Sequence, residues 1–203
     1  MFLVVLMLVL NFSISFWNAY ACGAQMGLAK QAGGFSKLML WSGLTMSACG
    51  FTWCYLAVLS FVGMYVPDFL NIHGGAEVDT SVKQAMLVTP ELANSIMSLG
   101  YAVIILPILG SGMAIWLESL VRAWKERSFG NIAVASWNTF ANVNNIYGFA
   151  QTAPSVWGNV GKLFKGDKNA AKLVFALVVL AVLGGILTTY SIAQWSNKKN
   201  YAK

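Results

Sequence analysis

The sequence predicts an all-α fold, that of a polytopic integral membrane protein with four transmembrane helices and amphipathic cytoplasmic-side helices. Of its 203 residues, 58% are hydrophobic and only 10% are charged, whereas soluble domains usually carry about 25% charged residues. The charged side chains avoid four long stretches and are concentrated between them. This distribution excludes a soluble enzyme, a disordered chain and a disulfide-stapled scaffold, and it makes the lipid bilayer the first expected partner.

Four charge-poor segments are each long enough to cross a bilayer as a helix. They cover residues 1–22, 38–66, 90–117 and 173–195. A hydrocarbon layer about 30 Å thick requires roughly 20 apolar residues in a helix. A helix also satisfies its backbone hydrogen bonds within one segment, as lipid demands. We therefore expect a single membrane domain over residues 1–203.

The first segment, residues 1–22, is interpreted as a true span rather than a cleaved signal peptide. The run Ala19-Tyr20-Ala21-Cys22 is similar to a cleavage site, but no lysine or arginine precedes the apolar stretch, as a signal peptide requires. Polar or small side chains recur on this segment at helical spacing. They are Asn11, Ser15, Asn18 and Cys22.

The second segment, residues 38–66, exceeds the roughly 20 residues that a span needs, so we expect it to tilt or to project beyond the hydrocarbon. Small residues recur along it at a spacing of 4-3-4-3. They are Gly43, Ser47, Gly50, Cys54 and Ala57. Because small residues let helix backbones approach closely, this pattern predicts the contact face of a left-handed helix pair.

The third segment, residues 90–117, begins with a clear helix-start signal. Thr89 is a suitable N-cap, Pro90 suits the first helical position, and Glu91 suits the first turn. Pro107 lies in the middle of the segment and predicts a kink.

Residues 118–172 are too periodic for an unstructured connector, and we expect an interfacial helical loop. Glu118, Arg122 and Glu126 are spaced for helical ion pairs. Four asparagines fall within about 60° of arc at 100° per residue. They are Asn131, Asn138, Asn142 and Asn145. Two interpretations stay open: a solvated polar face, or a hydrogen-bonded contact with another helix.

Pro154 is expected to end this helical stretch, and a short amphipathic helix is expected to follow. Trp157 and Phe164 lie on its apolar face, while Lys162 and Lys165 leave that face. This pattern predicts a helix at the membrane surface, in the cytoplasmic headgroup layer. The alternative is that the segment packs on the protein's own loops.

The fourth segment, residues 173–195, carries Ala181, Gly185 and Thr189 at four-residue spacing. Like the stripes on the first two segments, this one predicts a helix contact. Such contacts can lie inside one four-helix bundle, or they can reach another subunit.

The distribution of lysine and arginine predicts the orientation of the chain. With four spans, residues 23–37 and 118–172 share one side, and they carry most of the 13 basic residues. We therefore expect a plasma membrane or bacterial inner membrane protein with both termini on the non-cytoplasmic side. Basic residues that are split between two sides give no reason to expect nucleic acid as a partner.

The apolar spans lack ionisable side chains at membrane depth, which argues against a proton pump or a charge-coupled carrier. The lone histidine, His73, lies in a predicted external loop and cannot hold a metal by itself. Glycine-rich phosphate motifs, the Gly-x-Ser-x-Gly elbow and a redox Cys-x-x-Cys are absent from the sequence. We therefore expect no enzyme, no cofactor and no metal site.

The leading functional hypothesis is a non-enzymatic multi-pass membrane subunit. It packs with other membrane proteins, or with copies of itself, in a larger assembly. The alternative is a homo-oligomeric pore or channel lined by the polar stripe of the first span, because amides and hydroxyls can line a water path without charges. A lipid-acting enzyme is the weakest hypothesis, since only Glu91, Glu118 and Asp167 are suitably placed acids.

Overall fold

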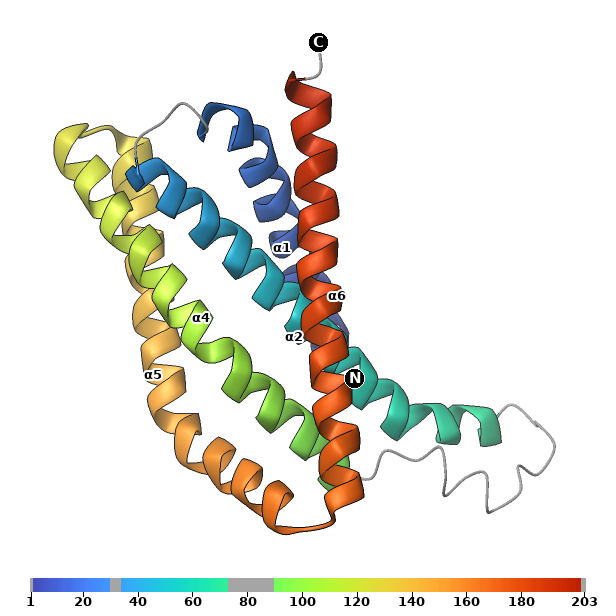
Figure 1. Ribbon diagram of the computed structural model, residues 1–203. Helices are drawn as coiled ribbons and strands as arrows, with labels where there is room; N and C mark the ends of the chain where they lie inside the picture. Colours follow the sequence, from blue (N-terminus) through green and yellow to red (C-terminus); the bar gives the residue numbers. More distant parts are fainter. Residues whose placement is uncertain (1, 30–33, 73–89, 202–203) are drawn as a thin grey trace.

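The chain folds into five long helices in the computed structural model, which describes residues 2–29, 34–72 and 90–201 (Figure 1). The helices are α1 (Phe2–Ala29), α2 (Gly34–Ile72), α4 (Pro90–Lys125), α5 (Phe129–Lys165) and α6 (Lys168–Tyr201). Four of them, α1, α2, α4 and α6, are long and apolar enough to cross a membrane. The all-helical fold and the four apolar helices of the sequence prediction are therefore confirmed.

Consecutive helices run in opposite directions. In the α1–α2 pair, the Asn18 side chain bonds to Gly43, while the carbonyl of Leu8 accepts from Cys54 at the far end. Helix α4 lies against the other side of α2, and α6 crosses α2 and α1 (Figure 1). The last turns of α2 run away from the other helices (Figure 1).

The most buried apolar cluster joins α2, α4 and α6, with one residue from the end of α5. Its buried members are Leu56, Ile96, Leu99, Leu163, Val174, Val178 and Ala181. Each fully buried side chain of this kind removes its surface from solvent and packs at crystal-like density. The cluster fixes the lower part of the bundle, where α5 turns into α6 (Figure 1).

The region between the third and fourth segments differs from the expected surface loop. Helix α4 continues to Lys125, and α5 then follows α4 back along its length as one helix of 37 residues (Figure 1). The expectation that Pro154 ends a helix is wrong, because α5 continues through it. Contacts with α4 on both sides of Pro154 hold the helix together: Thr152 bonds to Tyr101, and Asn159 bonds to Ser98.

Short turns at both ends of α5 force the antiparallel arrangement. Ser128 caps the first turn of α5, accepting a hydrogen bond from the Asn131 backbone at 3.2 Å. At the other end, the Gly166 N–H donates to the Lys162 carbonyl at 2.9 Å. The Asp167 carboxylate then accepts from the Asn169 backbone at 2.9 Å and starts α6. Because both turns are so short, α5 has no freedom to swing away from its neighbours.

The outer surface of the bundle is strongly apolar. Leu106 on α4 is 65% exposed, and Leu187 on α6 is 63% exposed. A water-soluble protein rarely presents such extensive apolar surface. Side chains of this kind on every described helix are what a hydrocarbon environment requires.

Candidate functional site

The polar stripe of α1 faces the small-residue stripe of α2 within the same chain. The Asn18 amide donates to the Gly43 carbonyl at 2.8 Å. Ser47 donates its hydroxyl hydrogen to the Ser15 carbonyl, and both serines are buried. Two of the predicted contact faces therefore satisfy each other.

Gly50 allows this close approach of α1 and α2. A Cβ added to Gly50 would lie 2.0 Å from the Ser15 hydroxyl oxygen and 3.3 Å from the Asn11 amide oxygen. The Asn11, Ser15 and Asn18 positions thus lie along a packed helix contact. A water path lined by these groups would require α1 and α2 to separate.

Gly185 marks the crossing of α6 over α2. A Cβ at this position would lie 2.4 Å from the Thr52 hydroxyl oxygen and 2.6 Å from the Ala48 carbonyl oxygen. One turn farther along α6, the hydroxyls of Thr188 and Tyr55 are 2.6 Å apart and share a hydrogen bond. This predicted contact residue is therefore also used inside the chain.

A polar seam joins α4 and α5, and the sequence predicts it only as one of two interpretations of the asparagine stripe. The Asn142 amide is buried and donates to two carbonyls, that of Gly112 at 3.0 Å and that of Asn138 at 2.9 Å. Gly112 leaves the space for it, because a Cβ there would lie 2.6 Å from the Asn142 amide oxygen. For Asn142, the helix-contact interpretation of the asparagine stripe is the one that the structure shows.

The seam continues along α5 through hydroxyl and indole groups. The Trp116 indole N–H donates to the Thr139 hydroxyl at 2.8 Å, and that hydroxyl donates to the Ala135 carbonyl at 2.7 Å. Near the other end, the Asn159 amide donates to the Ser98 hydroxyl at 3.1 Å. A signal for this seam exists in the sequence: the asparagines repeat on one face while no charged residue interrupts them.

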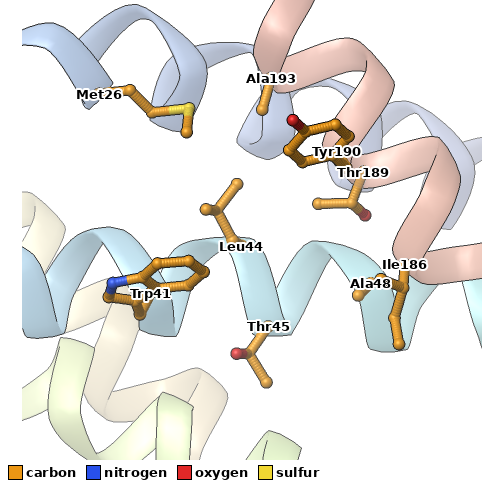
Figure 2. Close-up of a pocket in the computed structure, with 9 residues that line it drawn as sticks. All are labelled: Met26, Trp41, Leu44, Thr45, Ala48, Ile186, Thr189, Tyr190 and Ala193. Atoms are coloured by element: carbon orange, nitrogen blue, oxygen red, sulfur yellow. The ribbon is translucent and has the colours of Figure 1, made fainter.

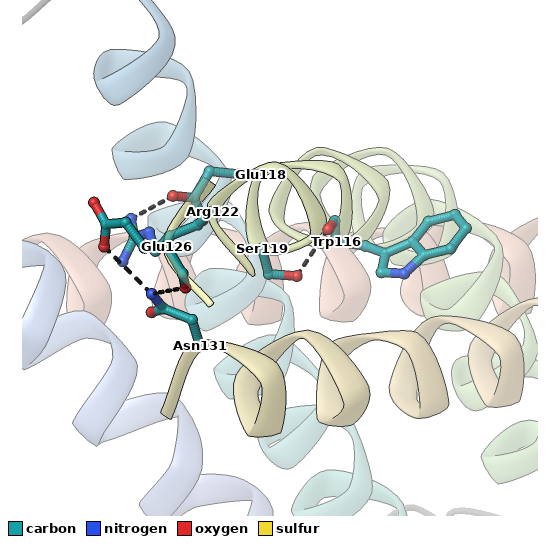
Figure 3. A network of polar contacts seen from close by, with 6 residues as sticks. All are labelled: Trp116, Glu118, Ser119, Arg122, Glu126 and Asn131. Carbon is teal, nitrogen blue, oxygen red and sulfur yellow. Dashed lines mark hydrogen bonds and ion pairs between the residues drawn. The ribbon is translucent and has the colours of Figure 1, made fainter. Parts of the chain in front are cut away.

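The turn between α4 and α5 holds a charged and polar network (Figure 3). Arg122 pairs with Glu118, as their spacing predicts. The Glu126 carboxylate instead accepts from the Asn131 amide at 3.3 Å, and the Glu126 carbonyl accepts from the same amide at 3.0 Å. These bonds hold the start of α5 against the end of α4.

The residues expected at the membrane surface belong to the last turns of α5. Trp157 and Phe164 point outward and are exposed, while Leu163 packs into the buried cluster. Lys162 and Lys165 lie in the last turn of the helix, where basic side chains complement the helix dipole. These four residues thus form one end of a long helix rather than a separate short one.

An apolar pocket of about 210 Å³ opens between α1, α2 and α6 (Figure 2). Its lining consists of Met26, Trp41, Leu44, Thr45, Ala48, Ile186, Thr189, Tyr190 and Ala193. Drug-sized ligands occupy roughly 300–1,000 Å³, so this pocket suits part of a hydrocarbon chain. The Tyr190 phenol is the only acid–base group in its lining, and general acid–base catalysis needs a matched partner.

A second, polar pocket of about 350 Å³ lies where α4 begins and α5 turns into α6. It brings Glu91 and Asp167 together with Lys162. The described residues pair none of these three groups in an ion pair, so they remain open to water.

Within the described part of the chain, no three His, Cys, Asp or Glu side chains are grouped to hold a metal ion. The chain matches no protein-family model, no curated protein and no solved structure. The features of the chain that bear on function are the helix contacts and the surface that they leave uncovered.

Proposed function

We propose that this chain is a non-enzymatic, multi-pass membrane subunit that packs with other membrane proteins, or with copies of itself, in a larger assembly. The observation that carries this proposal is an uncharged polar face on the outside of α5. The contact stripes of α1, α2 and α6 are used within the chain, so they leave this face as the best surface for a partner helix.

We call this face the outer seam of α5; it consists of Asn144, Gly148, Gln151 and Ser155, spaced 4-3-4. Asn144, Gln151 and Ser155 are exposed, and a Cβ on Gly148 would meet nothing within 4 Å. The spacing repeats that of the α2 stripe, whose small residues admit α1. Small and amide side chains at this spacing suit the close approach of another helix.

The outer seam lies level with the most apolar part of α4. The bonds of Asn142 to Gly112 and of Asn159 to Ser98 bracket this stretch of α5. An amide facing hydrocarbon without a partner is unfavourable, and amide bonds between membrane helices contribute about 0.6 kcal/mol each on average. The Gln151 amide donates to the Tyr147 hydroxyl, and a partner helix would supply hydrogen bonds to the Asn144 amide and to the remaining groups of Gln151.

The distribution of polar groups supports assembly better than either alternative. Asn11, Ser15 and Asn18 lie along the contact of α1 with α2, where a pore would need them to face water. Glu91 and Asp167 border an open pocket in which the Ser95 hydroxyl donates to the Glu91 backbone carbonyl at 2.8 Å, rather than to a basic side chain as in hydrolytic enzymes.

The test is the particle mass of the protein extracted in a mild detergent or in a lipid nanodisc. We expect wild-type particles to contain more than one chain, either copies or co-purifying membrane proteins. Gly148→Leu places a bulky side chain in the outer seam and is expected to shift most of the particles to the single-chain mass. Gly110→Leu is the matched control, because a Cβ at Gly110 on α4 also meets nothing within 4 Å.

Two outcomes would count against the proposal. If the wild-type protein runs as a lone chain with no partner, the proposed assembly does not exist. Equal particle masses for Gly148→Leu and wild type would show that the outer seam is not the contact surface.

A further inference from the structure

We infer that α5 crosses the membrane beside α4 as a fifth span whose exposed apolar flanks contact lipid hydrocarbon. The two termini of the chain then lie on opposite sides of the membrane. The inference shares with the proposed function the placement of α5 beside α4 in hydrocarbon, but it requires no protein partner.

The position of α5 alongside α4 places it in the membrane. Helix α5 keeps contact with α4 and with the turn that follows α4, through five hydrogen-bonded pairs spread along its length. They are Glu126–Asn131, Trp116–Thr139, Gly112–Asn142, Tyr101–Thr152 and Ser98–Asn159. Helix α4 is one of the four helices that are apolar enough to cross a membrane. A helix that lies alongside it over this whole length must occupy the same depth.

The surface of α5 has the composition that a membrane span requires. No charged residue occurs between Arg127 and Lys162. The flanks carry exposed apolar side chains, including Ile132, Val143 and Ile146. On the inner face, Thr139, Asn142 and Asn159 are hydrogen-bonded to α4 or to α5 itself, which is how a membrane helix accommodates polar groups.

Two exposed tryptophans of α5 are separated by the thickness of the hydrocarbon layer. Trp137 is 66% exposed and Trp157 is 53% exposed. They are 20 positions apart in the sequence, which corresponds to about 30 Å along a helix and equals the thickness of the hydrocarbon layer. Tryptophan is enriched at both membrane–water interfaces, so this pair marks the two borders of a span.

Basic residues are unequally distributed between the two ends of a five-span bundle. With five spans, chain connectivity places at one end the basic residues Lys30, Lys37, Arg122, Lys125, Arg127, Lys198, Lys199 and Lys203, with the acids Glu118 and Glu126. The other end receives Lys83, Lys162, Lys165, Lys168 and Lys172, with Asp68, Glu77, Asp79, Glu91 and Asp167.

The first end thus carries eight lysine and arginine residues, and the second end carries five. The excess of basic residues assigns the first end to the cytoplasm. The C-terminus is then cytoplasmic and the N-terminus is not. The four-span prediction differs, because it places both termini on the non-cytoplasmic side.

Three single cysteines distinguish the two topologies. In a background in which Cys22, Cys49 and Cys54 are replaced by alanine, Gly130→Cys reports the α4–α5 turn, Asn169→Cys the α5–α6 turn and Lys199→Cys the C-terminal end. All three positions are exposed. Intact cells or right-side-out vesicles are treated with a membrane-impermeant maleimide, and permeabilised samples give full labelling.

Five spans predict that Asn169→Cys is labelled from outside, at least tenfold more than Gly130→Cys and Lys199→Cys. Similar protection of Gly130→Cys and Asn169→Cys would place both turns on one side and overturn the inference. Labelling of Gly130→Cys and Lys199→Cys with protection of Asn169→Cys would overturn the assigned orientation. If the alanine background fails to fold, green fluorescent protein fused to the C-terminus of the unaltered chain decides: it fluoresces only if that end is cytoplasmic.

Discussion

The fit between Asn142 and Gly112 shows how a single residue fixes the place of α5. Both amide hydrogens of Asn142 are used, one on the Gly112 carbonyl and one on the Asn138 carbonyl. The space for the amide exists only because residue 112 lacks a Cβ. The sequence predicts the asparagine stripe, but it cannot identify Gly112 as the partner, because pairing depends on how α4 and α5 align in space.

At the residue scale, we expect Gly112→Ala to lower the free energy of unfolding by about 1–3 kcal/mol, because the added methyl group overlaps the Asn142 amide. Thermal unfolding in detergent, followed by circular dichroism, measures the effect. Gly110→Ala, two positions away on the same helix, has open space around its Cβ. It should raise stability by about 0.5–1 kcal/mol, the usual gain of alanine over glycine in a helix. A loss of stability in both variants would contradict the packing described here.

At the element scale, the crossing of α2 and α6 depends on Gly185. Its neighbour Gly184 faces the Tyr55 ring, where a Cβ would lie 3.2 Å from the nearest ring carbon. At Gly185 the nearest atoms include the Ala48 carbonyl oxygen at 2.6 Å, which belongs to the backbone and cannot rotate away. The two glycines are adjacent in sequence but differ in the space that is left for a Cβ.

We therefore expect Gly185→Ala to push α2 and α6 apart and to cost about 1–3 kcal/mol of stability. Gly184→Ala should cost clearly less, because the Tyr55 ring can shift by a few tenths of an ångström. The comparison can be made by unfolding each variant in sodium dodecyl sulfate and recording the midpoint. A larger loss for Gly184→Ala would mean that the helices cross at a different point.

The elements also show which parts of the fold the sequence can predict. Helices α1, α2, α4 and α6 are recognisable because long charge-free runs need no knowledge of a partner. Helix α5 is not, since asparagines interrupt its apolar residues, and it is not among the four helices that are apolar enough to cross a membrane. The sequence wrongly predicts a helix end at Pro154 for a similar reason. The proline removes one backbone hydrogen bond, and the contacts with α4 that compensate for it are not visible in the sequence.

At the scale of the whole molecule, the apolar exterior is the dominant feature. Large hydrophobic side chains such as Leu106, Phe140 and Leu187 point outward from three different helices. Individually exposed hydrophobic residues are ordinary in soluble proteins, but a continuous surface of this kind is not.

We therefore expect the full chain to stay in the membrane pellet when membranes are washed with carbonate at pH 11, a treatment that releases peripheral proteins. The retained fraction should exceed that of a peripheral protein in the same preparation by at least tenfold. Release of the chain into the supernatant would contradict the apolar exterior as a lipid-facing surface.

The short turns at the two ends of α5 have a consequence for biosynthesis. The ribosome synthesises α4 before α5. One face of α5 is rich in amides, Asn142 among them, and their transfer into hydrocarbon without hydrogen-bond partners is unfavourable. Helix α4 supplies the complementary carbonyls, and a link of only a few residues keeps it beside the emerging α5. In the five-span arrangement that we infer, the two helices therefore leave the translocon together as a hairpin, in which α4 supplies hydrogen-bond partners to α5.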